Sequence, residues 1–188
     1  MMNGRLILLI CVLLLAAGPL GADARSPWAA LSAGGHFAMV RHAQAPGGGD
    51  PQEFTLGDCT TQRNLNDAGR AQARRVGDMF RAGGVTQAKV FTSQWCRCRD
   101  TAVGMALGPV VDLPFLNSFH RTPKLKDERL AGLRKWLAEQ PLDQPTVLVT
   151  HFTLISGIAG TGPRPGDAVI VRREGDGRFT VVATMAAD

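Results

Sequence analysis

Short apolar runs alternate with amphipathic stretches through most of this chain, a pattern typical of an α/β fold. Apolar runs bounded by polar or glycine-containing segments predict strands at residues 36–41, 89–93 and 146–151, and a short extended piece at 109–116. Apolar residues at helical spacing predict helices at 66–84, 96–107, 126–140 and 153–160. Residues 167–174 and 177–185 flank a Gly-Asp-Gly turn and predict a closing hairpin.

The strand–helix–strand order predicts parallel strands with helices on both faces of the sheet. We therefore expect a three-layer α/β sandwich with a mostly parallel central sheet and a C-terminal hairpin.

The first residues have the pattern of an export signal rather than of a folded element. Arg5 precedes an apolar run at 6–17, which is short for a membrane span, and Ala22-Asp23-Ala24 has the small-x-small form of a cleavage site. We expect residues 1–24 to be a signal peptide and residues 25–188 to be one domain. The protein is then periplasmic or secreted, with no stable membrane insertion after cleavage.

The charge balance narrows the class of partner. The net charge of +5 favours anionic partners. The basic residues are spread along the chain and form no stripe with interleaved aromatic residues, which argues against nucleic acid. A small phosphorylated substrate fits this pattern.

Basic side chains follow the predicted parallel strands at the points where they end. Arg41 and His42 close the first strand, Ser93 closes the second with Arg97 soon after it, and His151 closes the third. Because ligands bind outside the carboxyl ends of such strands, two arginines and two histidines are expected in one crevice.

These residue types suit phosphoryl chemistry. Guanidinium groups match the oxygens of a phosphoryl group, and two of them aimed at one place are costly unless an anion lies there. A neutral imidazole is a competent nucleophile. We expect Arg41 and Arg97 to hold the anion, His42 to be the nucleophile, and His151 to stabilise the transferring group.

Four segments resemble the histidine phosphatase superfamily, which includes the phosphoglycerate mutases. They are VRHAQAP, LNDAGRAQARRVG, TSQWCRCRDTA and LVTHFTLISGIAG, in the family's order over residues 36–160, and DCTTQRNL resembles exported bacterial members. The resemblance implies hydrolysis of a phosphate monoester through a phosphohistidine on His42, with Arg97 and His151 as the second catalytic arginine and histidine. It implies no metal and no cofactor.

The chain departs from the family pattern at three places. Ala43 replaces a glycine, and the usual phosphate-binding asparagine falls at Gly48, so Arg63 is a candidate replacement and Ser93 a further candidate substrate contact. The segment LNSFHR at 116–121 lacks the family's acidic proton donor. Asp167 is a candidate donor, and so is the pair Asp127-Glu128, although surface charge explains that pair equally well.

The cysteines that follow the predicted signal are Cys59, Cys96 and Cys98, an odd number in an oxidising compartment. On a helix, Cys96 and Cys98 point about 200° apart and cannot share a partner. The resemblance places a small apolar residue at position 98 and a polar one at 96. We therefore expect a Cys59–Cys96 disulfide beside Arg97 and a buried Cys98 thiol, and the C-x-C spacing is not a usual zinc pattern.

A different class of function fits the same residues. A non-catalytic binding protein for phosphate or a phospho-sugar would use the same pocket, and the missing acid favours it. Turnover of an activated aryl phosphate separates the two hypotheses.

Overall fold

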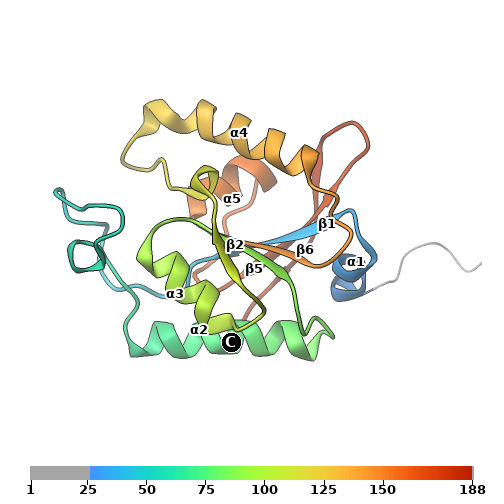
Figure 1. Ribbon diagram of the computed structural model, residues 1–188, viewed down its shortest axis with the longest axis horizontal. Coiled ribbons are helices and arrows are strands. Elements are labelled where there is room, and N and C mark those ends of the chain that lie inside the picture. Colours follow the sequence, from blue (N-terminus) through green and yellow to red (C-terminus); the bar gives the residue numbers. More distant parts are fainter. Residues whose placement is uncertain (1–25, 188) are drawn as a thin grey trace, which may run out of the picture.

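The computed structural model describes residues 26–187, so the predicted signal peptide lies outside the described residues. Within them, a six-stranded sheet has helices on both faces (Figure 1). In chain order the elements are α1 (Pro27–Ala33), β1 (His36–Arg41), η1 (Cys59–Thr61), α2 (Asp67–Ala82), β2 (Lys89–Thr92), α3 (Cys96–Met105), β3 (Val110–Asp112), η2 (Pro114–Leu116), η3 (Pro123–Leu125), α4 (Lys126–Glu139), β4 (Thr146–Thr150), α5 (Phe152–Ala159), β5 (Ala168–Arg173) and β6 (Phe179–Met185).

The strand order is β3-β2-β4-β1-β5-β6. Strands β3, β2, β4 and β1 pair in parallel, whereas β5 runs antiparallel to both β1 and β6. This is the predicted mostly parallel sheet with a C-terminal hairpin.

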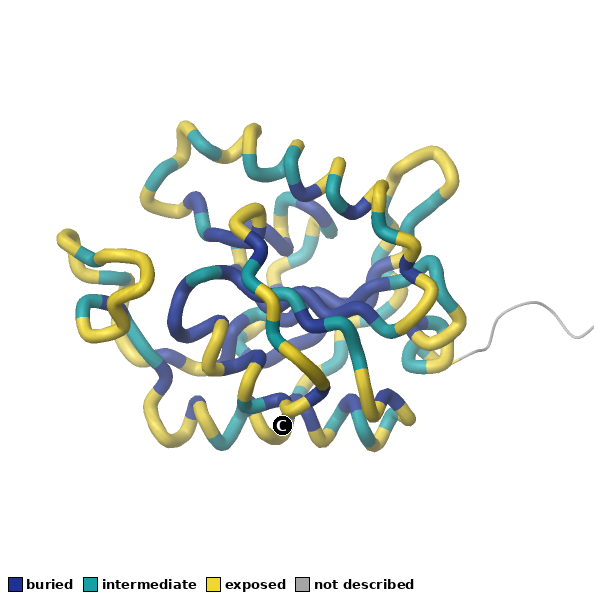
Figure 2. The backbone as a smooth tube through the Cα atoms, viewed as in Figure 1, coloured by how far each residue is buried: buried dark blue, intermediate teal, exposed yellow. Residues whose placement is uncertain are grey.

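Alternation along β1 divides the core between the two faces of the sheet. Ala38 and Val40 pack with buried residues of α1, α2 and α3, whereas Phe37 and Met39 pack with α4 and α5. The residues on both faces of β1 are apolar because helices cover this central strand on each side. The central strands β1, β4 and β5 are accordingly buried along most of their length (Figure 2).

Two glycines on α2 permit close packing against α3 and against the loop that follows β1. A Cβ at Gly77 would lie 2.0 Å from the carbonyl oxygen of Met105, the last residue of α3. A Cβ at Gly69 would lie 2.0 Å from the carbonyl oxygen of Gln44, in the loop that follows β1. These contacts set the distance from α2 to α3 and to the loop after His42.

The structure differs from the sequence prediction at two elements. Helix α1, which was not predicted, is seven residues long, begins at the Ser26 cap with Pro27 in its first turn, and buries Leu31. Such a short helix gives no repeated apolar spacing. The extended segment predicted at 109–116 keeps strand pairing only in β3, because Pro114 begins the 3₁₀ turn η2.

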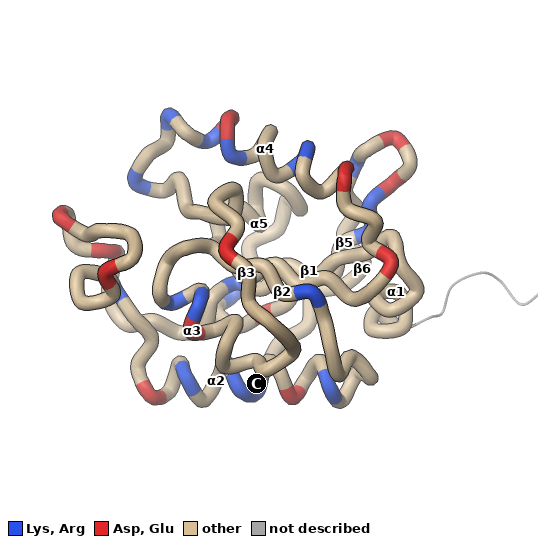
Figure 3. Tube along the Cα trace, viewed as in Figure 1, with Lys and Arg blue, Asp and Glu red and all other residues tan. Residues whose placement is uncertain are grey.

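Acidic and basic positions are interspersed over the surface, including along α2 and α4 (Figure 3). None of the helices within residues 26–187 is long and apolar enough to cross a membrane.

Candidate active site

The ends of the three central parallel strands bring the two predicted histidines together. The amide of His42 donates to the carbonyl of Thr150 at 2.9 Å, so the residues that follow β1 and β4 are neighbours. The imidazole rings of His42 and His151 lie 5.4 Å apart between centroids. Strand β2 ends alongside them and leads into α3, which carries Arg97.

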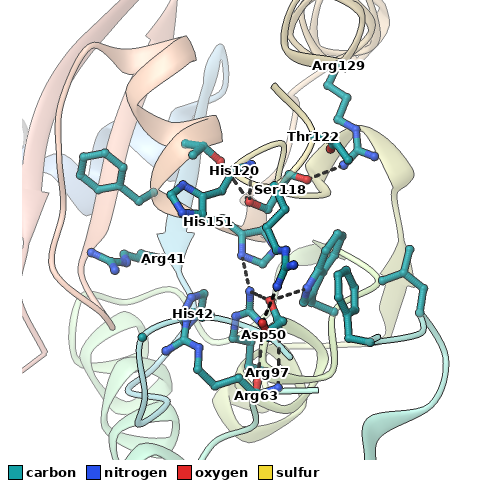
Figure 4. A pocket seen from close by; sticks show the side chains of 18 residues that line it. Arg41, His42, Asp50, Arg63, Arg97, Ser118, His120, Thr122, Arg129 and His151 are labelled. Atoms are coloured by element: carbon teal, nitrogen blue, oxygen red, sulfur yellow. Dashed lines mark hydrogen bonds and ion pairs between the residues drawn. The ribbon is translucent and has the colours of Figure 1, made fainter. Parts of the chain in front are cut away.

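A cavity of about 860 Å³ opens over these strand ends. Its walls include Arg41, His42, Arg63, Arg97 and His151, all expected from the sequence, and also Gly48 (Figure 4). The cavity is much larger than a phosphoryl group, so the rest of a substrate has room beside it. Its other lining residues are Gly49, Asp50, Phe54, Leu56, Trp95, Ser118, His120, Arg121, Thr122, Arg129, Phe152 and Thr153.

His42 is held in the form that a nucleophile requires. Its Nδ1 lies 2.8 Å from the carbonyl oxygen of Ala43, which only accepts hydrogen bonds, so Nδ1 carries the proton and Nε2 has the free lone pair. Burial, and then the positive charge of Arg97, lower the pKa of His42 from 6.5 to about 3. The ring is therefore neutral at pH 7 and available for attack.

Three arginines line the cavity with this histidine, one buried and two half-buried, and each has a donor atom to spare. The Nε atoms of Arg41, Arg63 and Arg97 are buried without a hydrogen-bond partner among the described residues. Burial lowers the pKa of Arg41 and of Arg63, an unfavourable environment for cations. Arginines arranged in this way are suited to an anion with several oxygens.

Asp50 faces the arginines and was not identified from the sequence. Its side chain is 7% exposed, and its two oxygens accept from Arg97 Nη1 at 2.8 Å and Nη2 at 3.1 Å. Trp95 Nε1 and the Arg63 amide also donate to it. Burial acts to raise the pKa of Asp50, but the Arg97 hydrogen bonds and charge hold it below the ordinary value.

Nothing in the local sequence distinguishes Asp50 from its neighbours. Glu53 and Asp58 lie in the same loop and are exposed. Only the path of the loop, which no periodicity predicts, brings Asp50 to Arg97.

Ser93 lies behind His151 and is not among the residues that line the cavity. Its Oγ is 2.9 Å from His151 Nε2 and 3.0 Å from Asn117 Oδ1, and all three residues are buried. The structure therefore places Ser93 against a catalytic candidate, and its assignment as a substrate contact stays a prediction.

The three acidic residues considered as proton donors also lie outside the cavity lining. Asp167 is buried, and its Oδ2 accepts from the Arg164 amide at 2.8 Å. Asp127 and Glu128 are exposed in the first turn of α4. The identity of a proton donor stays a prediction.

The structure contains a Cys59–Cys96 disulfide and a buried free thiol at Cys98. Gln62 supports the same junction, since its side-chain oxygen accepts from the Cys96 amide at 3.0 Å. The loop that carries Asp50 and Arg63 is thus attached to the first turn of α3, one residue before Arg97. Burial raises the pKa of the Cys98 thiol to about 12, so it stays protonated.

Within residues 26–187, no group of three or more histidine, cysteine or acidic side chains is arranged to hold a metal ion.

Comparison with known proteins gives one family and one fold. Residues 37–120 match the model of the histidine phosphatase superfamily (branch 1). A search of curated proteins gives no match.

Solved structures of low sequence identity share the fold. The protein histidine phosphatase SixA in complex with tungstate superposes with a TM-score of 0.57 at 17% identity, covering 81% of this chain and 97% of that one. A phosphoserine phosphatase from Entamoeba histolytica gives 0.59 at 14% identity over 81% and 98%. The mycobacterial glucosyl-3-phosphoglycerate phosphatase gives 0.56 at 17% identity over 78% and 96%.

The matched segment contains Arg41, His42, Ser93 and Arg97, while His151 lies beyond it, directly after β4, the strand that pairs with β1. Residues 37–120 thus resemble the histidine phosphatase superfamily (branch 1) in sequence, and the chain shares its fold with the solved phosphatase structures.

Proposed function

We propose that this protein is an exported phosphomonoesterase that hydrolyses its substrate through a phosphohistidine on His42, without a metal or other cofactor. The observation that carries the proposal is the His42 ring, whose Nδ1–H donates to the Ala43 carbonyl and whose Nε2 is left free in a cavity lined by arginines.

In the first step, Nε2 of His42 attacks phosphorus and the bond to the leaving oxygen breaks. Arg41, Arg63 and Arg97 stabilise the phosphoryl oxygens. In the second step, water attacks the phosphohistidine, releasing phosphate and restoring His42.

Brief incubation with a phosphorus-labelled substrate, followed by a denaturing quench, tests the intermediate. We expect acid-labile, base-stable label on His42, and no label in His42→Ala. A near wild-type turnover number in His42→Ala would rule out this mechanism.

The non-catalytic alternative predicts binding of phosphate without turnover. It draws support from Asp50, the one carboxylate among the cavity-lining residues, because its pairing with Arg97 lowers its pKa and keeps it ionised, without a proton to donate. Turnover of 4-nitrophenyl phosphate, whose leaving group needs little protonation, by wild type and not by His42→Ala would exclude the binding protein.

Substrates that differ in their leaving group can identify the residue that donates the proton. A variant that lacks the donor should lose much more activity on phenyl phosphate than on 4-nitrophenyl phosphate, because only the poorer leaving group needs the proton. We expect this selective loss in Asp167→Asn if Asp167 is the donor. A uniform loss on both substrates would show that it is not.

The charge of the cavity indicates the substrate class. Five arginines and one carboxylate line it, so even without a contribution from histidine it carries more positive charge than one phosphate ester of charge about −2 neutralises. We propose a small substrate with a second anionic group. The arginines are Arg41, Arg63, Arg97, Arg121 and Arg129.

A matched substrate pair tests this class. We expect 3-carboxyphenyl phosphate to give a higher kcat/KM than 3-carbamoylphenyl phosphate, and Arg129→Gln to reduce the ratio. Lys135→Gln is the control, because Lys135 is exposed on the same helix and does not line the cavity. An equal reduction of the kcat/KM ratio in both variants would indicate an effect of the overall charge of the protein rather than a binding site at Arg129.

A further inference from the structure

A chain of buried hydrogen bonds determines which nitrogen of His151 carries its proton. The chain begins at Asn117, directly after η2. Asn117 Oδ1 lies 2.9 Å from the Gln94 amide, which only donates, and Asn117 Nδ2 donates to Gln94 Oε1 at 2.8 Å. These two bonds fix the orientation of the Asn117 side-chain amide.

The orientation of Asn117 fixes the hydrogen of Ser93. Because Oδ1 of Asn117 can only accept, the single hydroxyl proton of Ser93 is donated to it across 3.0 Å. The Ser93 oxygen then has only lone pairs left. It accepts from the Trp95 amide at 3.3 Å, and it lies 2.9 Å from His151 Nε2, which must therefore be the donor.

The other side of the His151 ring gives the same answer independently. Arg97 Nη2 lies 3.4 Å from His151 Nδ1, and a guanidinium can only donate, so Nδ1 must have its lone pair free. Cys98 supports the same assignment. Its thiol donates to the Thr150 carbonyl at 3.7 Å. Its sulfur, 3.5 Å from His151 Nε2, can then only accept from that nitrogen.

The alternative tautomer would be unfavourable at both nitrogens. A proton on Nδ1 would point at an N–H group of Arg97. An unprotonated Nε2 would face the Ser93 oxygen, whose proton is already donated to Asn117. Both contacts are buried, where a polar group without a partner costs most.

We propose that Ser93 and Asn117 are positioning residues that hold His151 as the Nε2–H tautomer, with its Nδ1 lone pair directed toward Arg97 inside the cavity. The tautomer follows from the hydrogen bonds alone, whereas its catalytic consequence rests on the proposed function.

The catalytic consequence concerns the second half of the reaction. A water oxygen bonds to phosphorus, the bond from phosphorus to Nε2 of His42 breaks, and its electron pair returns to that nitrogen. The proton that the water loses passes to Nδ1 of His151, whose lone pair becomes available when Nη2 of Arg97 turns from it to the phosphoryl oxygens. Burial lowers the pKa of His151, and the negative charge of the phosphoryl group beside it offsets that effect. His151 thus acts here as a proton acceptor, a role for which Asp50 is hindered by its pairing with Arg97.

Nitrogen NMR of histidine-labelled protein reads the tautomer directly and does not require turnover. The chain has four histidines, and His151→Gln assigns the His151 signals. We expect a protonated Nε2 and an unprotonated Nδ1 in wild type. Ser93→Ala and Asn117→Ala each remove a link of the chain, and loss of one hydrogen bond should move the tautomer ratio by roughly three- to tenfold toward Nδ1–H.

Thr150→Val is the matched control. Thr150 precedes His151 in sequence, and its buried hydroxyl donates to the Leu116 carbonyl at 2.7 Å rather than to a member of the chain that holds the His151 ring. We expect this variant to keep the wild-type tautomer. Ser93→Thr keeps a hydroxyl and should restore the wild-type spectrum.

Decay of the isolated phosphoenzyme tests the catalytic consequence. The enzyme is phosphorylated with 2,4-dinitrophenyl phosphate, excess donor is removed, and loss of label is followed in quench-flow. Ser93→Ala should decay about tenfold more slowly than wild type, and kcat should fall more than KM changes.

Each outcome decides a separate statement. An Nδ1–H signal in wild type, or an unchanged tautomer in Ser93→Ala, would overturn the positioning role. A shifted tautomer with unchanged decay would overturn the role as proton acceptor. Failure to form any phosphoenzyme would overturn the proposed function and with it the hydrolytic step, while the spectra would still decide the tautomer.

Discussion

Replacing Asp50 by alanine tests whether the cavity is a preformed anion site in which this carboxylate partly neutralises the arginines. The Arg97 and Asp50 side chains are 5% and 7% exposed, and they form two hydrogen bonds of 2.8 and 3.1 Å. Removing one partner of a buried pair leaves the other charge uncompensated, which typically costs 3–5 kcal/mol, and we expect a loss of about that size in the free energy of unfolding.

Asp112→Ala is the matched control, since Asp112 pairs with Arg99 on the partly exposed face of α3. Exposed pairs contribute about 0–1 kcal/mol, so this variant should lose little. Urea denaturation of both variants gives the two free energies in the absence of phosphate.

Phosphate should distinguish an anion site from a merely structural ion pair. A carboxylate beside bound phosphate repels it, so Asp50→Ala should bind phosphate more tightly than wild type and recover more of its stability when phosphate is added. At 100 times the Kd, bound phosphate contributes about 2.7 kcal/mol. If Asp50→Ala were as stable as Asp112→Ala, or gained less from phosphate than wild type, the reasoning would be refuted.

Three further predictions follow from the same site. Arg97→Ala should lower kcat by about 10²–10³ and Arg97→Lys should restore part of it, because a lysine keeps the charge but not the planar fork; a raised KM with unchanged kcat would indicate ground-state binding only. Replacing Cys59 and Cys96 by serine should cost about 4 kcal/mol in urea denaturation, from the sequence separation of 37 residues, and a loss under 1 kcal/mol would contradict the entropic estimate. Because the pKa of folded His42 lies at about 3, the unfolded chain binds a proton there below pH 6.5 that the folded chain excludes, so stability should fall as the pH falls from 6.5 to 4. His42→Gln should reduce that slope by about 1.4 kcal/mol per pH unit, and an unchanged slope would show that His42 takes up its proton in the folded state.

The repeated spacing of apolar residues was enough to predict the layers of the fold. Strands β1, β4 and β5 each contain a run of three or four consecutive apolar residues because both faces of these central strands are covered. Along α2 the buried residues recur at helical spacing. Each of these signals is local, so it survives without knowledge of any distant contact.

The gathering of Arg41, His42, Arg97 and His151 could also be predicted, since each residue lies at or near the end of a parallel strand and such ends meet at one edge of the sheet. The disulfide partner of Cys59 followed from the opposed directions of Cys96 and Cys98 on one helix together with the family resemblance.

Only the tertiary structure decided the contacts that tune the site. Asp50 lies 47 residues from Arg97 in a loop without regular spacing, and Ser93 meets Asn117 across a 3₁₀ turn. Hydrogen-bond direction depends on atoms placed within a few tenths of an ångström, whereas the sequence determines only which residue types occur on each element. The physical reason is that burial sorts residues by face and period, but the path of a loop, and with it the partner of a buried charge, is set by packing over the whole domain.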